Sequence, residues 1–325
     1  MSAVLVTGGA GYTGGHLCRS LVQRGGKVRT LVLPGTDTGA LRALGVEIVV
    51  GDLTRKETLR PAVLGVDVVY HIAAVYREQN VPRRVFWDVN VTGTRNLLES
   101  AEDAGVKRFV HCSTVGVQGD IRNPPATEEA PYAPGDYYQE SKMEGELLAL
   151  KFHAERKLPV VVFRPVGIYG PGDTRFLKLF RNVARPMIGS GNVLYHLTYI
   201  DDLVEGIRLA GETSGIEGEI ITLAGPRYTT LNELYAAIAE ALGTRPSRIH
   251  LPVLPFLLAG AACETACRPF RISPPIYRRR MDFFVKDRAF DISKARRILG
   301  YDPRVDLKEG LAKTAAWYQE KGLIG

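Results

Sequence analysis

Short apolar runs alternate with helical patterns as far as about residue 224, and this alternation constrains the fold more than any other feature. A strand joined to the next strand through a helix pairs with it in parallel, because the helix crosses one face of the sheet. The sequence therefore predicts an α/β fold with a doubly wound parallel sheet. Helices are predicted over about 82–104 and around 138–142, and strands over about 3–7, 28–33, 46–50, 66–72, 107–112, 159–163 and 218–224.

Three glycines follow the first predicted strand. Gly8, Gly11 and Gly14 lead into a helical pattern that carries Leu17 and Leu21. Without side chains the loop lets a pyrophosphate approach the backbone, where free N–H groups and the helix dipole meet its charge. The usual dinucleotide fingerprint is Gly-x-Gly-x-x-Gly, whereas the spacing here is Gly-x-x-Gly-x-x-Gly. Such a cluster is often only a tight turn, but between a strand and a helix it indicates a cofactor loop.

A tyrosine and a lysine stand four residues apart in a predicted helix. Tyr138 and Lys142 therefore share a helix face, and the ammonium favours the charged form of the phenol. A free tyrosine has a pKa of about 10. A neighbouring positive charge lowers that pKa towards the working range, which makes Tyr138 a candidate acid/base. Alone, the same spacing also fits an exposed helix face with an aromatic–lysine contact.

The glycine loop, the pair Ser113-Thr114 and the Tyr-x-x-x-Lys spacing, in this order, resemble the extended short-chain dehydrogenase/reductase superfamily and its NAD-dependent epimerase/dehydratase group. The resemblance implies a Rossmann-type sheet and a smaller, mostly C-terminal substrate domain. It implies a dinucleotide-binding domain over 1–165 plus about 192–225, and a substrate domain over 166–191 plus 226–325. Family-like strings recur along nearly the whole chain, at 51–53, 71–74, 90–94, 164–172, 199–203 and 299–303.

The resemblance also assigns roles to single residues. Thr114 is expected to orient the reacting oxygen beside Tyr138, with Ser113 in support, although hydroxyl residues are also common at strand ends. Lys142 is expected to hold the cofactor ribose as well as to lower the pKa of the tyrosine. Further contacts with the cofactor are expected from Gly8, Gly11, Tyr12, Thr13, Gly14, Asp52, Leu53, Ala73, Ala74, Asn90 and Pro165.

The end of the second strand bears on the choice between NAD and NADP. An acid there would bind the ribose hydroxyls of NAD, and an arginine would accept the extra phosphate of NADP. The chain reads Leu31-Val32-Leu33-Pro34 and offers neither. We therefore predict NAD, with NADP left open, since no cation is placed for the phosphate. Asp52 is expected at the adenine, and its alternative role is that of a turn or helix-capping carboxylate.

Composition agrees with an ordinary globular enzyme. The chain has 325 residues, of which 45% are hydrophobic and 24% charged, enough for one large and one smaller domain. It enters a strand at once, without the pattern of a secretory signal, so we expect a cytoplasmic protein. The longest apolar run, 251–263, is broken by Pro252 and Pro255 and is shorter than the roughly 20 residues of a spanning helix. No membrane span is therefore predicted.

The cysteines and the charge argue against two other classes of site. Cys263 and Cys267 lie one helical turn apart without nearby histidines, so we predict no metal site. The net charge is +7, yet the basic residues are spread along the chain and form a run only at 278–280. Nucleic acid is therefore not predicted as a partner. One basic stripe at helical spacing is predicted to face solvent, or alternatively an anionic substrate: Arg175, Lys178, Arg181 and Arg185.

The substrate is a small molecule whose class the sequence leaves open. Many nucleotide-sugar relatives carry an asparagine and an arginine where this chain has Gly167 and Tyr195. The short link from 170 to 199 and the apolar segment 251–263 resemble 3β-hydroxysteroid dehydrogenases and dihydroflavonol reductases instead. Arg288, in contrast, matches a diphosphate-binding arginine of UDP-glucuronate decarboxylases.

We therefore predict an NAD(P)-dependent oxidoreductase acting on a secondary alcohol or ketone of an apolar or steroid-like substrate. The alternative is a nucleotide-sugar epimerase or dehydratase, with Arg288 on the diphosphate. A second alternative is a non-catalytic cofactor sensor, which is disfavoured because such relatives usually lose the tyrosine and lysine. The helices around 82–104 and 136–156 resemble those that form four-helix interfaces in this family, so a homodimer is expected.

Overall fold

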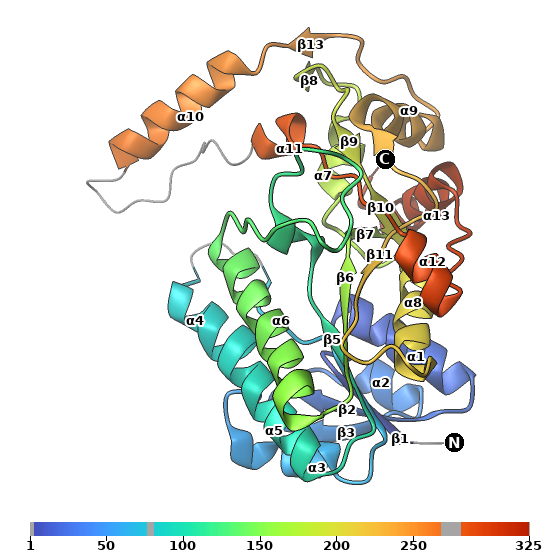
Figure 1. Ribbon diagram of the computed structural model, residues 1–325. Helices are drawn as coiled ribbons and strands as arrows, with labels where there is room; N and C mark the ends of the chain where they lie inside the picture. The colour runs from blue at the N-terminus through green and yellow to red at the C-terminus, as the bar shows by residue number, and fades with distance from the viewer. Residues whose placement is uncertain (1–2, 77–80, 268–280, 325) are drawn as a thin grey trace.

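The computed structural model describes residues 3–76, 81–267 and 281–324. Its centre is a seven-stranded parallel sheet in the order β11-β6-β5-β4-β1-β2-β3 (Figure 1). Each of the seven predicted strands is present, which confirms the doubly wound α/β fold. The strands are β1 (Ala3–Thr7), β2 (Lys27–Val32), β3 (Glu47–Val50), β4 (Val68–His71), β5 (Arg108–Cys112), β6 (Val160–Pro165) and β11 (Ile220–Leu223).

The strand order reverses between β1 and β4, which are neighbours in the sheet although β2 and β3 separate them in sequence. Ligands of open α/β sheets bind beyond the carboxyl ends of the strands at such a point. Thr7 and His71 are register partners at these two ends, and His71 is in turn the partner of His111 on β5. The topology therefore places the end of β1, and the loop that follows it, beside the ends of β4 and β5.

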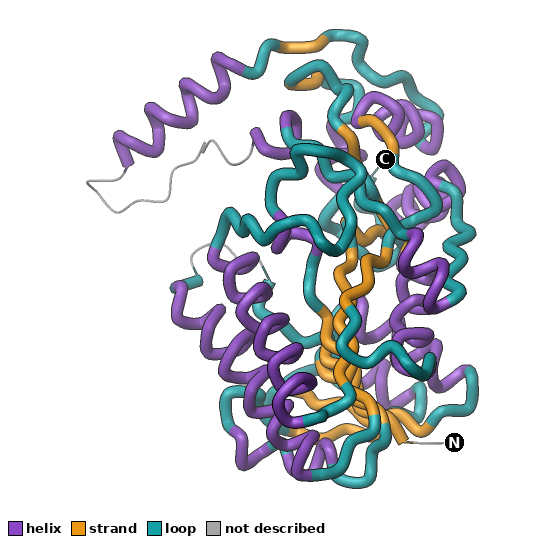
Figure 2. The backbone as a smooth tube through the Cα atoms, viewed as in Figure 1, coloured by secondary structure: helices purple, strands orange, loops and turns teal. Residues whose placement is uncertain are grey.

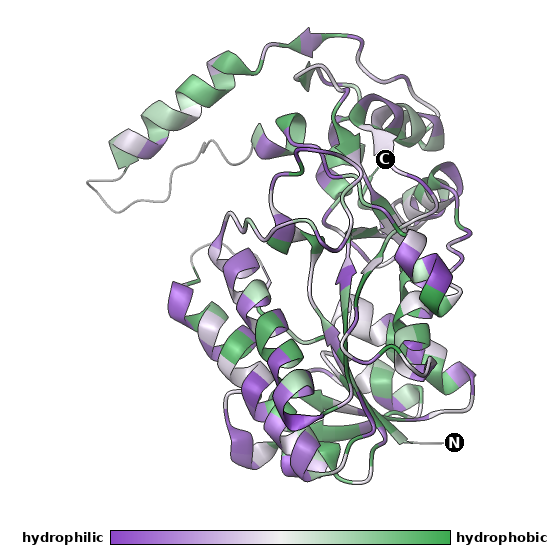
Figure 3. Cartoon of the chain, viewed as in Figure 1, coloured by the Kyte–Doolittle hydropathy of each residue, from purple (hydrophilic) through white to green (hydrophobic). Residues whose placement is uncertain are grey.

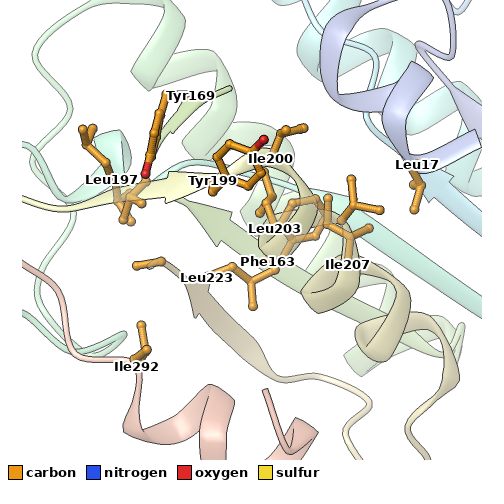
Figure 4. Packing of buried hydrophobic residues seen from close by; sticks show 14 of the residues in the cluster. Leu17, Phe163, Tyr169, Leu197, Tyr199, Ile200, Leu203, Ile207, Leu223 and Ile292 are labelled. Carbon is orange, nitrogen blue, oxygen red and sulfur yellow. The ribbon is translucent and has the colours of Figure 1, made fainter. Parts of the chain in front are cut away.

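Helices cover both faces of the sheet (Figure 2). On one face α1 (Tyr12–Gln23) packs against α8 (Ile200–Glu212), and on the other α5 (Thr94–Asp103) packs against α6 (Tyr137–Arg156). Figure 4 shows apolar side chains of α8 lying against the sheet residues Phe163 and Leu223. Shorter elements on the N-terminal half are α2 (Gly39–Ala43), η1 (Lys56–Thr58), α3 (Arg60–Val63), α4 (Arg83–Trp87) and η3 (Val115–Gln118).

The helix predicted over 82–104 is present but contains a π-helical turn. This turn, η2 (Asp88–Gly93), joins α4 to α5 without a break. The Oγ1 of Thr94 donates a 2.8 Å hydrogen bond to the main-chain oxygen of Asn90 inside the turn. At Gly145 of α6 a Cβ atom would lie only 2.7 Å from the same oxygen, so α6 passes η2 at a distance that glycine permits. π turns occur often near functional sites.

The remaining elements lie mostly beyond the carboxyl ends of the sheet (Figure 1). β10 (Leu197–Tyr199) pairs with β7 (Gly167–Tyr169), and β9 (Leu194–Tyr195) with β12 (Thr229–Thr230), so both ladders cross the predicted boundaries near 192 and 225. The division into two domains stays a prediction. The other elements are β8 (Met187–Ile188), β13 (His250–Leu251), α7 (Leu177–Asn182), α9 (Leu231–Ala241), α10 (Leu254–Cys267), α11 (Asp282–Val285), α12 (Ser293–Leu299) and α13 (Leu307–Glu320).

The predicted basic stripe over 175–185 is wrong as a helix face. α7 is only six residues long, so Arg175 precedes it and Arg185 follows it. Arg175 turns back to the Asp173 carboxylate, and Arg181 donates to the main-chain oxygen of Leu323. Turn residues before α7 and the contact with the C-terminal segment override the helical spacing. The arginine run 278–280 lies outside the described residues.

Two further findings concern the described part of the chain. Within 3–76, 81–267 and 281–324 no helix has both the length and the apolar character needed to cross a membrane. Over the same ranges no three histidine, cysteine, aspartate or glutamate side chains come together in a way that could hold a metal ion. Cys263 and Cys267 both lie on α10 as free thiols.

Candidate active site

The glycine loop forms an anion-binding turn at the start of α1. Gly8 has a φ of +76°, and its carbonyl oxygen accepts a 2.9 Å bond from the N–H of Gly11. A Cβ atom at Gly14 would overlap that same carbonyl, so the turn requires glycine there. Gly11 caps α1 without a side-chain hydrogen bond, and the first turn of the helix carries no acid. The first N–H groups of α1 are thus free to bind a negatively charged ligand.

A cavity of about 1020 Å³ opens beyond the carboxyl ends of the strands and includes this loop. It brings together most of the residues that the sequence singled out, from six different segments. Those that line it are Gly8, Gly11, Tyr12, Thr13, Gly14, Ala73, Ala74, Ser113, Thr114, Tyr138, Lys142, Pro165 and Arg288. Three predicted cofactor contacts, Asp52, Leu53 and Asn90, do not line the cavity.

The residues of the cavity fit a dinucleotide. Two of its hydroxyl groups, Tyr12 OH and Ser113 Oγ, are buried and have no hydrogen-bond partner within the described part of the protein. Buried polar atoms are nearly always paired, so two orphaned hydroxyls beside a glycine loop indicate the place of a bound polar group. The loop provides uncapped N–H groups and no side chain in front of them. These features suit a pyrophosphate with its attached ribose.

Tyr138 and Lys142 lie on the first turns of α6. Asp136 begins this helix by accepting a 2.6 Å bond from the N–H of Gln139, which fixes where the first turn starts. Tyr138 is 9% exposed and Lys142 is 2% exposed, whereas Tyr137 is 52% exposed. The helix therefore turns Tyr138 and Lys142 towards the cavity and leaves Tyr137 in solvent, as the spacing predicted.

Burial lowers the pKa of the Lys142 ammonium. The nearby Cys112 and Glu146 offset this effect in part, and the pKa stays below that of a free lysine. The ring of Tyr76 packs edge-on against that of Tyr138, with 5.0 Å between the ring centres. A cation with little access to water acts strongly on its neighbours, because the local dielectric is low. Lys142 is thus suited to stabilise negative charge inside the cavity.

Ser113 and Thr114 follow the end of β5 and face the same cavity. Thr114 Oγ1 accepts a 3.1 Å hydrogen bond from the N–H of Gly116, which leaves its own hydrogen for another acceptor. A Cβ atom at Gly116 would lie 3.0 Å from Nε2 of Gln139, so this turn is close to the start of α6. The predicted hydroxyl is therefore held near the helix that carries the tyrosine.

His71 and its partners form a buried network that the sequence did not reveal. Thr94 Oγ1 donates its hydrogen to the main-chain oxygen of Asn90. It therefore accepts a 2.9 Å hydrogen bond from Nε2 of His71. Nδ1 of His71 then accepts from Thr7 Oγ1, also at 2.9 Å. Burial and then the charge of Lys142 lower the pKa of His71 to about 3, so the ring is neutral. A neutral histidine thus joins the end of β1 to η2.

Asn90 extends this network to α6, the helix that carries Tyr138 and Lys142. Its side chain bonds to both main-chain groups of Val75, and its Nδ2 donates a 2.9 Å bond to Ser141 Oγ. Ser141 Oγ in turn donates 2.8 Å to the main-chain oxygen of Tyr138. The amide of Asn90 is therefore occupied in positioning α6, and its predicted contact with the cofactor stays a prediction. The sequence assigned no role to Ser141 or to Thr94, because their roles depend on distant partners.

The other two residues outside the cavity have local roles. Asp52 Oδ1 accepts from the N–H and the hydroxyl of Thr54, at 2.8 and 2.9 Å, as a turn carboxylate does. Leu53 is 6% exposed and belongs to the core beneath α5. Their predicted contacts with the cofactor, including that of Asp52 with the adenine, remain predictions.

A buried ion pair fixes α6 to β6. Arg164 Nε lies 3.1 Å from Glu146 Oε2, and its Nη2 lies 2.5 Å from Oε1. Tyr132 OH donates to the same carboxylate at 2.6 Å, and Nη1 of Arg164 donates to the main-chain oxygen of Glu128 at 3.0 Å. Glu146 stands one helical turn beyond Lys142. Both charges are removed from water, so the loss of either partner would leave an uncompensated charge in the protein interior.

Beyond the tyrosine the cavity is lined largely by apolar side chains, and most of its charged groups are already paired. Arg175 Nε lies 2.8 Å from Asp173, and Lys286 Nζ lies 3.1 Å from Asp282. The apolar lining consists of Val115, Val166, Ile168, Phe176, Leu179, Leu197, Phe283 and Phe290. This half of the cavity is therefore suited to an apolar ligand.

Arg288 reaches the cavity from the segment after α11 and is bonded to Tyr195. Its Nη1 donates a 2.5 Å hydrogen bond to the Tyr195 hydroxyl, and its guanidinium lies 5.3 Å from the centre of that ring. Its backbone N–H donates to the oxygen of Leu194 at 2.8 Å. Tyr195, which stands where nucleotide-sugar relatives carry an arginine, thus engages the cation proposed for the diphosphate.

A model of the NAD dependent epimerase/dehydratase family matches residues 4–224, which include the glycine loop, Tyr138 and Lys142. The chain belongs to this epimerase/dehydratase family. It is 32% identical to the sterol demethylase protein B of Methylococcus capsulatus, over 98% of this chain and 99% of that protein. It is 31% identical to the 3beta-hydroxysteroid-dehydrogenase/decarboxylase isoform 1 of Arabidopsis thaliana, over 95% of this chain and 78% of that protein.

Solved structures match along nearly the whole chain. The crystal structure of gox2253 has a TM-score of 0.87 at 29% identity and covers all of both chains. The dTDP-glucose 4,6-dehydratase DesIV from Streptomyces venezuelae, solved with NAD and TYD bound, has a TM-score of 0.78 at 29% identity and covers 98% of this chain and 97% of its own. The predicted family is confirmed, and with it the interpretation as an NAD(P)-dependent oxidoreductase of this family.

A valine in place of Gly11 should abolish dinucleotide binding and leave the fold intact. A Cβ atom at this position would meet only the Gly8 oxygen, at 3.3 Å, so the new side chain has room but fills the space where a pyrophosphate meets the backbone. The measurement is a calorimetric titration with NAD, with the melting temperature as the check on folding. Gly14→Ala is the contrasting variant, since it displaces the loop itself and should lower the melting temperature. Unchanged NAD affinity in Gly11→Val would show that the loop is only a turn.

Replacing Lys142 by methionine should remove activity without destabilising the protein. The folded state binds the Lys142 proton less tightly than the unfolded chain does, so burying the ammonium costs stability at neutral pH. This cost declines as the pH rises from the lowered pKa towards about 10.4, the pKa of a free lysine. We expect Lys142→Met to melt roughly 1–2 °C higher at pH 7 for each kcal/mol of relieved cost. A lower melting temperature would mean that the contacts with Glu146 outweigh the desolvation.

Proposed function

We propose that this protein is an NAD(P)-dependent dehydrogenase that transfers a hydride between the nicotinamide and a secondary alcohol or ketone of an apolar substrate. The observation that carries the proposal is the cavity beside Tyr138, whose lining is largely apolar and whose acidic side chains include two, Asp173 and Asp282, that are paired with cations. The relatives named sterol demethylase and 3beta-hydroxysteroid-dehydrogenase support a polycyclic substrate. Their cavities would need the same combination of one polar end and a long apolar wall.

In this proposal Tyr138, Thr114 and Lys142 have separate roles in the oxidation of the alcohol. Tyr138 in its phenolate form takes the proton of the substrate hydroxyl, and Thr114 donates a hydrogen bond that orients the same oxygen. Lys142 stabilises the phenolate and binds the cofactor ribose. NAD, when bound, supplies the acceptor for the hydride. In the reverse direction Tyr138 returns the proton to the oxygen of the ketone.

We infer a preference for NAD over NADP from the end of β2. Leu33 follows this strand and is 56% exposed, and the sequence places no cation beside it for a ribose phosphate. The DesIV structure, which covers nearly all of this chain, was solved with NAD bound. Competing titrations with the two nucleotides test the preference. Equal affinity would mean that neither form of the ribose is selected at Leu33.

A nucleotide-sugar epimerase or dehydratase is the second candidate, and Arg288 in the cavity is the observation that favours it. Two contacts weaken it. The guanidinium of Arg288 is bonded to the hydroxyl of Tyr195, and a Cβ atom at Gly167 would lie 2.7 Å from Leu197 Cδ2. An asparagine for the diphosphate would therefore have to displace Leu197. A cofactor sensor is the weakest candidate, because Tyr138 and Lys142 both line the cavity.

We also propose that the protein forms a homodimer through the outer faces of α5 and α6. These two helices pack side by side on one face of the sheet, and Leu147 on α6 is 41% exposed. Pairing two such helices from each copy would form the four-helix interface that the resemblance implies. Light scattering after size-exclusion chromatography tests the proposal. A monomer at micromolar concentration would contradict it.

Tyr138→Phe should keep the packing of the ring and lose the group that transfers the proton. We expect turnover to fall by roughly 100-fold or more, with little change in nucleotide affinity. Tyr137→Phe is the matched control, because its side chain is exposed and stands one position away on the same helix. The assay follows NADH formation with 3β-hydroxysteroids as substrates. Retained turnover in Tyr138→Phe would remove the tyrosine from the mechanism.

The binding of nucleotides separates the two substrate classes. If the substrate is apolar, UDP should leave the melting temperature of the NAD-loaded protein unchanged, and Arg288→Ala should cost stability through its lost bond to Tyr195. If the substrate is a nucleotide sugar, UDP should raise the melting temperature. A contact between arginine and a diphosphate is worth about 1.5–3 kcal/mol. A stabilisation by UDP that disappears in Arg288→Ala would overturn the apolar proposal.

A further inference from the structure

α10 is an apolar helix without a place in the core. Its sequence from Leu254 to Cys267 contains one charged residue, Glu264, and the helix extends away from the rest of the protein (Figures 1 and 3). Gly260 is its only buried residue, and no α10 side chain belongs to either hydrophobic cluster. A helix that is apolar on all sides is normally buried in a protein or in lipid.

The exposed side chains of α10 form a continuous face. Leu254, Leu258, Ala262 and Ala266 follow one another at four-residue spacing, and all four are exposed. Leu254 and Leu258 have exposed fractions of 64% and 62%, among the highest of the large apolar side chains described. Single exposed leucines need no explanation, but an uncharged face three turns long marks a binding surface.

The sequence around α10 carries almost all of the excess positive charge of the chain. Residues 244–280 contain seven arginines and one glutamate, which amounts to six of the seven net charges of the whole protein. Arg245, Arg248 and His250 stand just before α10, and all three are exposed. The remaining five arginines belong to the sequence after α10, outside the described residues. An apolar helix is thus surrounded in sequence by cations.

We propose that α10 docks the protein onto an anionic lipid surface. The apolar face enters the headgroup region, and the exposed Arg245 and Arg248 are attracted to the negative lipids. The helix has 14 residues, too few for a span, so it rests in one leaflet. A second copy of this chain fits the surface less well, because a two-fold interface through α10 would bring two sets of the same arginines together.

The docking surface adjoins the cavity along the chain. The described residues resume at Met281, and the next helix, α11, contributes Asp282 and Phe283 to the cavity. Docking itself does not depend on the proposed activity and can be tested without a substrate.

The test is sedimentation of the full chain with vesicles of phosphatidylcholine, pure or mixed with phosphatidylglycerol. We expect binding to the mixed vesicles only, and binding that weakens at high salt. Leu254→Gln/Leu258→Gln should reduce the partition coefficient by roughly tenfold or more. Leu64→Gln is the matched control, since Leu64 is 58% exposed but follows α3 at the opposite end of the sheet. Arg245→Gln/Arg248→Gln should lower binding by roughly fivefold per arginine at low salt.

Three results would overturn the proposal. The first is the absence of binding to either kind of vesicle by a protein with its normal melting temperature. The second is equal loss of binding in Leu64→Gln and in the α10 double variant, which would show a non-specific effect. The third is a dimer in vesicle-free solution that dissociates in Leu254→Gln/Leu258→Gln, because α10 would then be covered by a second copy.

Discussion

A chain of buried hydrogen bonds holds the tyrosine-bearing helix against the strand that leads into the glycine loop, and the geometry of the site depends on it. The chain runs from Thr7 through His71 and Thr94 to Asn90, whose amide reaches Ser141 on α6. A buried polar group that loses its partner costs about 1–3 kcal/mol, so every member of the chain keeps the others in place. The glycine loop and α6 are thus joined by polar contacts as well as by core packing.

The same burial determines the charge inside the site. His71 and His111 lie next to each other at the ends of β4 and β5, and burial, followed by the charge of Lys142, lowers the pKa of both. Burial also raises the pKa of the Cys112 thiol to about 11. These three groups are therefore neutral at pH 7. Lys142 lies beside them with a pKa that burial lowers, and groups with perturbed pKa values gather at functional sites.

The two halves of the cavity have different origins. Glycines, hydroxyls and strand ends of the parallel sheet build the half that suits a dinucleotide, and this arrangement follows from the topology of the fold. Segments after β6 contribute most of the apolar side chains of the other half, together with the pair Arg288–Tyr195. A fold of this type hosts different substrates through changes in such segments. α10 continues this apolar character outside the cavity.

The sequence alone determined the sheet, the glycine turn and the shared face of Tyr138 and Lys142. These features depend on residues close together in the chain, because strand length, helical spacing and the sterics of glycine are local properties. Tertiary structure alone decided that Asn90 bonds to Ser141 and that Arg288 bonds to Tyr195. These two contacts join residues 51 and 93 positions apart. No local pattern encodes which polar groups meet once the core has formed, so these contacts could not be predicted from the sequence.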